Sequence, residues 1–208
     1  MNRHELIDMG LKGFLAWLML SGLVLYGGEW LVKVLFPLIR AVMMTMTQEM
    51  AISLKLVKSP QSQFDYSIEL VAWVLRPIYL NTEKYIPPKT DLESSVHLLH
   101  ALVPIVIEAT ILLVWPVQHW RQRVLLLVLG LPTAVLVLMA TLPAQLLGSL
   151  ELSIQVTALT GNNPRSSPWF LDWMVFCELG GRWLLGIAAA WLCIQLQRGL
   201  LRVRYFSA

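Results

Sequence analysis

An acidic residue in the middle of an apolar run is the first candidate for chemistry in this sequence. Glu108 lies within Ile105–Thr110, inside an apolar run that extends from His97 to Val117. An ionisable group inside a membrane is costly, so it marks either a proton or ion site or a hydrogen bond that fixes two helices together. The sequence leaves both readings open and favours the interhelical hydrogen bond.

A second candidate is a pair of opposite charges in the last apolar run. Glu178 and Arg182 are four residues apart, so they lie on one face of a helix and can form an ion pair. Gly180 and Gly181 stand between them, and small residues let a second helix approach closely. We interpret this face as an assembly contact rather than a catalytic site.

Cys177 offers a sharper alternative, an intramembrane thiol enzyme. A thiol near the guanidinium of Arg182 becomes a nucleophile when it is ionised. His97 and His100 are the candidate bases, because they precede the second apolar run on the side where the last run begins. A thiol in an apolar helix is usually inert, so the enzyme remains the weaker reading. The two histidines lack a third ligand at suitable spacing, and we expect no metal and no cofactor.

The composition indicates that these residues belong to a membrane protein. Of 208 residues, 57% are hydrophobic and 14% are charged, whereas soluble domains carry about 25% charged residues. The net charge of +3 comes from basic residues beside the apolar runs, which indicates topology rather than nucleic-acid binding. No Gly-rich phosphate loop, HExxH or GxSxG motif points to an enzyme class.

The apolar runs predict an all-α integral membrane protein with four transmembrane helices, since about 20 apolar residues cross a bilayer core. In the first run, Gly27 and Gly28 precede Glu29, and we expect this glycine pair to face another helix. The predicted segments are a cytoplasmic N-terminus (1–12), the first helix with an interfacial extension (13–50), an extracytoplasmic β segment (51–95), a transmembrane hairpin (96–150), an extracytoplasmic loop (151–170), the fourth helix (171–197) and a basic cytoplasmic tail (198–208).

The segment between the first two helices has the pattern of strands. Ile52–Lys58 alternates apolar and polar residues and Tyr66–Leu75 is rich in β-forming residues, which predicts a small β-hairpin. Two strands alone are marginally stable in water. We therefore expect the hairpin to lean on the membrane helices, the membrane surface or a partner. The Met-rich stretch Met43–Met50 is either a partner contact or ordinary packing within the protein.

The basic residues predict the orientation. If both termini and the turn of the central hairpin share one side, the short segments there carry many basic residues, and the positive-inside rule makes that side cytoplasmic. We therefore expect a multi-pass protein of the bacterial inner membrane. The residues that favour this orientation are Arg3, Lys12, Arg121, Arg123, Arg198, Arg202 and Arg204.

Four short pieces of the chain carry a resemblance in layout: Trp120–Arg123, Gly130–Pro132, Gln145–Gly148 and Ser167–Trp169. On these the chain resembles the small four-span membrane proteins that accompany exosortases in bacterial envelope sorting systems. The resemblance departs at the outer segment and around Gly180 and Gly181. It implies an accessory role without catalytic residues. Exosortases themselves look like Cys/Arg membrane transpeptidases.

The leading prediction is a noncatalytic accessory subunit of an inner-membrane complex for envelope biogenesis, secretion or conjugative transfer. Its partners would be other membrane subunits or a second copy, in contact with the lipid bilayer and without nucleic acid. One alternative is a cysteine transpeptidase or protease that uses Cys177 and Arg182. Another is a small proton-coupled channel or transporter subunit centred on Glu108.

Overall fold

Long apolar helices set the dimensions of the molecule. The computed structural model describes residues 3–58, 66–79, 85–159 and 166–206. Three helical segments within these ranges are long and apolar enough to cross a membrane: Ile7–Met46, Trp120–Val156 and Trp169–Leu201. They belong to α1 (Arg3–Met46), α3 (Trp120–Leu159) and the broken helix α4–α5. The remaining apolar helix, α2 (Leu98–Val114), has 17 residues.

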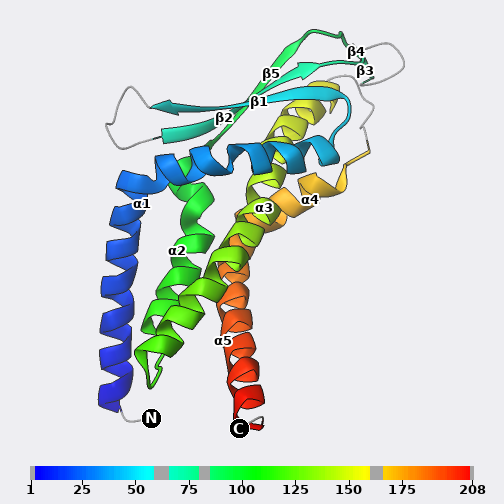
Figure 1. Ribbon diagram of the computed structural model, residues 1–208. Coiled ribbons are helices and arrows are strands. Elements are labelled where there is room, and N and C mark those ends of the chain that lie inside the picture. The colour runs from blue at the N-terminus through cyan, green and yellow to red at the C-terminus, as the bar shows by residue number, and fades with distance from the viewer. Residues whose placement is uncertain (1–2, 59–65, 80–84, 160–165, 207–208) are drawn as a thin grey trace.

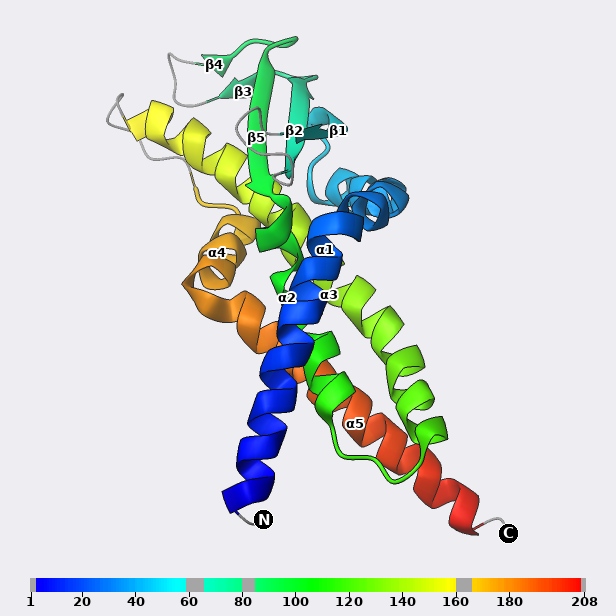
Figure 2. The same ribbon diagram turned by 90° about the vertical axis from the view of Figure 1, so that its left-hand side faces the viewer.

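The helices form a bundle with a small sheet at one end (Figure 1). Both chain termini and the connection between α2 and α3 lie at the opposite end, and the view in Figure 2 agrees. At that connection Arg123 donates hydrogen bonds to the carbonyl oxygens of Leu112 and Leu113, which satisfies the free carbonyls at the end of α2. The side chain of Gln197 donates to the carbonyl oxygen of Gln122 at 2.6 Å, so α5 is tied to the same turn.

The sheet contains the predicted hairpin and one strand more. β1 (Met50–Lys58) pairs antiparallel with β2 (Tyr66–Val74), with Met50 opposite Val74 and Lys58 opposite Tyr66. β5 (Asp91–His97) pairs with the other edge of β2. β3 (Ile78–Tyr79) and β4 (Tyr85–Ile86) form a separate two-stranded ribbon. The third strand corrects the expectation of a lone hairpin, and three strands on a helical layer are far less marginal than two.

The main apolar core lies between the sheet and the helices. α1 bends, so that its C-terminal part crosses beneath the sheet while its N-terminal part runs along α2 (Figure 1). Ile39 and Met43 from this crossing part are fully buried with Ile68 and Leu70, which point to the same face of β2. Met43 therefore packs within the protein, whereas the neighbouring Met44 is exposed.

Helices continue through residues 151–159, where the sequence predicts a loop. α3 extends to Leu159 because this part packs on the sheet-side core, where Leu150 and Ile154 are buried. Ser149 of α3 also shares a hydrogen bond with Ser94 of β5. Residues 160–165 of the predicted loop lie outside the described residues. Contacts made by α3 after it leaves the bundle, rather than its own sequence pattern, keep it helical.

The last apolar run is also different from the single helix expected at 171–197. It consists of α4 (Trp169–Phe176), a kinked turn η1 (Cys177–Gly181) and α5 (Arg182–Phe206). Gly180 has a φ of 111°, a conformation that glycine adopts without a steric penalty. The direction of the chain changes here, so that α4 lies across α5 (Figure 2). The Trp173 indole donates to the carbonyl oxygen of Ala140 at 2.7 Å and fixes α4 on α3.

Candidate functional site

A buried arginine holds the helix break together. Arg182 is 2% exposed. Its Nε donates to the carbonyl oxygen of Cys177 at 3.1 Å, and its Nη2 lies 2.5 Å from Oε1 of Glu178. A guanidinium carries five donors in a rigid plane and can satisfy several acceptors at once. Arg182 therefore binds the backbone and the acid of the turn immediately before it.

The same cluster reaches two other helices. Arg182 Nη1 donates to the carbonyl oxygen of His100 in α2 at 3.4 Å. The His100 ring lies 3.7 Å from Oε2 of Glu178, and the amide of Gln145 in α3 donates to Oε1 of Glu178 at 3.5 Å. Half of the Glu178 side chain is exposed. The cluster thus has its cation inside and its acid at the surface, where three helical segments meet.

Cys177 contributes its backbone to this cluster. Its thiol-bearing side chain is fully buried, and its carbonyl oxygen binds Arg182. His100 faces Glu178, and His97 is exposed at the end of β5. The fold therefore brings together Cys177, Arg182 and His100 from the predicted set, but it directs the guanidinium to carbonyl oxygens and a carboxylate.

A second polar cluster joins α2, α3 and α5. Glu108 is 1% exposed, and its Oε1 accepts a hydrogen bond from the hydroxyl of Thr133 in α3. Cys193 in α5 places its sulfur 3.1 Å from the Thr133 hydroxyl and 3.9 Å from Oε1 of Glu108. Within the described residues, Oε2 of Glu108 has no hydrogen-bond partner. Sequence reasoning missed Thr133 and Cys193, whose only signal is polarity within an apolar run.

The predicted packing glycines have different surroundings. A Cβ atom on Gly28 would lie 3.0 Å from Cδ1 of Leu102, so α1 and α2 are close at this point. A Cβ on Gly181 would collide with the ring of Phe176. Among the described residues, a Cβ built on Gly27 or Gly180 would meet no neighbouring atom within 4 Å. Of the four, Gly28 alone marks a close approach between two separate helices.

Glu29 links α1 to the sheet. It forms an ion pair with Lys33 one turn later and accepts a hydrogen bond from the Tyr66 hydroxyl in β2. This hydrogen bond raises the pKa of Tyr66 above its usual value, because loss of the phenolic proton would leave two negative charges together. Glu29 thus fixes the start of β2 on the first helix.

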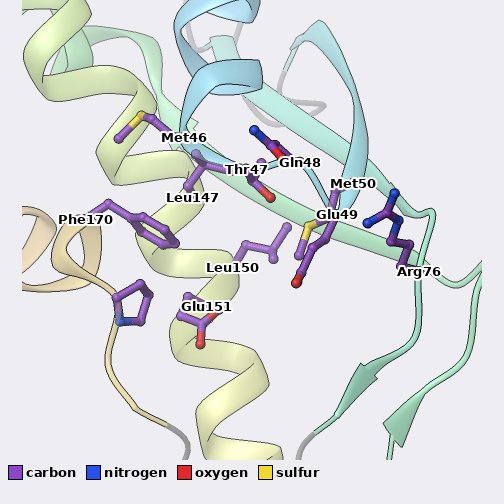
Figure 3. Close-up of a pocket in the computed structure, with 11 residues that line it drawn as sticks. Met46, Thr47, Gln48, Glu49, Met50, Arg76, Leu147, Leu150, Glu151 and Phe170 are labelled. Atoms are coloured by element: carbon purple, nitrogen blue, oxygen red, sulfur yellow. The ribbon is translucent and has the colours of Figure 1, made fainter.

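A cleft of about 330 Å³ opens beneath the sheet, where the ends of α1 and β2 meet α3 and the start of α4 (Figure 3). Glu49 and Glu151 extend toward it from opposite sides, and Arg76 lies at its edge. Apolar walls come from Leu147, Leu150 and Phe170. The cleft combines residues from four distant parts of the chain, and sequence patterns did not indicate it.

These arrangements connect helices. Each of the two polar clusters draws its groups from three helical segments. Among the described residues, no three His, Cys, Asp or Glu side chains are grouped to hold a metal ion. Comparisons with protein-family models, with curated proteins and with solved structures find no match to this chain.

Proposed function

We propose that the protein is a noncatalytic accessory subunit of a bacterial inner-membrane complex. It crosses the membrane four times, through the N-terminal part of α1, through α2, through α3 and through α5. Three of these segments have the length and composition to span a bilayer. The fourth, α2, has 17 residues, which is at the short end of the range of about 17–25 residues for a spanning helix.

The orientation follows from charge and from the position of the ends. Both termini and the α2–α3 connection lie at one end of the bundle (Figure 1), and basic residues such as Lys12, Arg121 and Arg198 lie near that end. The positive-inside rule favours the cytoplasm for that side. The sheet and the cleft beneath it then face the outside of the membrane.

The observation that supports a noncatalytic role is the use of Arg182. Its guanidinium donates to two backbone carbonyl oxygens and pairs with Glu178, and the residue is 2% exposed. A catalytic arginine must reach a substrate or a developing charge. Here Arg182 links α2 to the helix break, and the side chain of Cys177 in the same turn is buried.

The outer end supplies the surface for a partner. The sheet and the cleft with Glu49 and Arg76 are built on the main apolar core, so they form a stable platform rather than a loose loop. The layout shared with exosortase-associated proteins favours an envelope sorting complex. A secretion complex and a conjugative-transfer complex are the alternative settings for the same accessory role.

The test is recovery of partners from native membranes. The protein, tagged at its C-terminus, is extracted in a mild detergent and purified, and the co-purified chains are identified by mass spectrometry. The proposal expects a stoichiometric membrane partner or a defined oligomer. A monomer that is stable alone and catalyses a reaction lost in Cys177→Ala would overturn it in favour of the thiol enzyme.

A further inference from the structure

A groove between α2 and α3 places Glu108 beside a purely apolar surface. It has a volume of about 290 Å³ and is lined by Ile105, Ala109 and Leu112 of α2 and, from α3, by Val124, Leu127, Val128, Gly130, Leu131 and Ala134. Glu108 is the only lining residue with a polar side chain. Pockets for small molecules have this composition, with apolar walls and a few polar groups that fix orientation.

In the described residues, one oxygen of the Glu108 carboxyl group has a hydrogen-bond partner and the other has none. Oε1 accepts from Thr133 and lies near the Cys193 thiol, on the side of α3 and α5. Oε2 is buried without a hydrogen-bond partner in the described residues. A buried polar atom left without a partner costs about 1–3 kcal/mol. Glu108 thus contributes to the wall of the groove a carboxyl group whose Oε2 has no partner among the described residues.

The dimensions of the groove fit a chain molecule better than a helix. Its lining on α3 runs from Val124 to Ala134, which is about 15 Å at the rise of an α-helix. A volume near 290 Å³ is at the lower limit of about 300–1,000 Å³ for small-molecule pockets. Gly130 forms part of its wall, and a Cβ there would lie 2.6 Å from Cδ1 of Leu112, so the missing side chain keeps the two helices close.

We propose that this groove binds an uncharged lipid-soluble alcohol or phenol, with its hydroxyl on Oε2 of Glu108 and its apolar chain along α3. A hydroxyl both donates and accepts, so it satisfies Oε2 whether the carboxyl group is ionised or protonated. A molecule with a charged head would have to carry that charge into the apolar layer. The inference rests on the proposed membrane insertion but not on any partner protein.

The test uses a photoreactive decanol on the protein in lipid nanodiscs, with adducts mapped by peptide mass spectrometry. Labelling should concentrate on residues 105–112 and 124–134. Free decanol should compete about fivefold to tenfold better than decane, the difference expected for one hydrogen bond. Glu108→Leu should remove this discrimination. Equal competition by decane on the wild type would overturn the proposal, since it indicates partition into an apolar surface only.

A matched pair of variants separates binding in the groove from general contact with lipid. Ala134→Leu adds bulk inside the groove, whereas Ala188→Leu adds the same bulk on the exposed face of α5. Labelling should fall with the first variant and stay unchanged with the second. Equal labelling in both would overturn the proposal, as would crosslinks from this groove to another protein chain in native membranes. Recovery of the chain in nanodiscs reports membrane insertion separately.

Discussion

Gly186 of α5 lies directly against the backbone of Pro104 in α2. A Cβ atom on Gly186 would be 2.5 Å from the carbonyl oxygen of Pro104. The proline cannot donate a backbone hydrogen bond, and the glycine has no side chain, so the two helices touch backbone to backbone. This contact holds α5 on α2 midway between the Arg182 cluster and the Glu108 cluster.

Gly186→Ala should therefore destabilise the protein by about 1–3 kcal/mol, the usual cost of overpacking a tight contact. Thermal unfolding in detergent, followed by circular dichroism, measures the effect. Gly199→Ala is the matched control, because a Cβ on Gly199 meets nothing within 4 Å. Equal stability of the two variants would contradict the close approach of α2 and α5.

Arg182→Met should destabilise the fold more than Glu178→Gln. The first change removes the side-chain donor of the carbonyl oxygens of Cys177 and His100, at about 1–3 kcal/mol each. The second leaves Arg182 buried but still bound to both carbonyls, and Glu178 itself is half exposed, where solvent weakens the ion pair. A double-mutant cycle by denaturant unfolding measures the coupling. The opposite order of stabilities would mean that the acid, not the carbonyl oxygens, holds the guanidinium.

Gly180→Ala and Gly181→Ala should both destabilise, for different reasons. Gly180 has a positive φ and open space around it, so alanine there costs about 1–2 kcal/mol of backbone strain. Gly181 does not have a positive φ, but a Cβ there has no room beside the ring of Phe176. Phe176→Leu should therefore rescue Gly181→Ala and leave Gly180→Ala unrescued in thermal unfolding. If Phe176→Leu rescued both variants, packing against the Phe176 ring would explain both losses of stability, and backbone strain at Gly180 would not.

Alkaline titration should detect the hydrogen bond between Tyr66 and Glu29. The bond raises the pKa of Tyr66 above 10.0 in the folded protein, so its contribution to stability is complete below pH 10 and is lost as the pH rises through the folded pKa. The difference in tyrosinate absorbance between the wild type and Tyr66→Phe isolates this group. Glu29→Gln should return its titration toward the ordinary value. A wild-type titration unchanged by Glu29→Gln would contradict the bond.

Cysteine labelling tests the orientation of the proposed spans. Lys55 and Arg121 are exposed at opposite ends of the molecule, and both native cysteines are buried. In intact cells, a membrane-impermeant thiol reagent should modify Lys55→Cys and should reach Arg121→Cys only after the inner membrane is opened. The wild type, with Cys177 and Cys193 only, is the control for background. The reverse pattern would invert the topology.

Local patterns in the sequence were enough to find the main elements. Apolar runs identify the long helices, because the length and composition of a run are read from neighbouring residues. No knowledge of tertiary contacts is needed. The alternation in Ile52–Lys58 and the β-forming residues after Tyr66 gave two paired strands, which the structure contains as β1 and β2. The combination of Glu178, Arg182 and two glycines, which the sequence singled out, lies at the kink between α4 and α5.

The tertiary structure alone decided the rest. The sequence of β5, Asp91–His97, has little apolar character. It is a strand because it pairs with the edge of β2 and because Ser94 shares a hydrogen bond with Ser149 of α3. Gly180 lies where the chain changes direction, and its positive φ depends on where α4 must lie. Thr133 and Cys193 are distant from Glu108 in sequence. Such contacts depend on how the helices pack, which no local periodicity encodes.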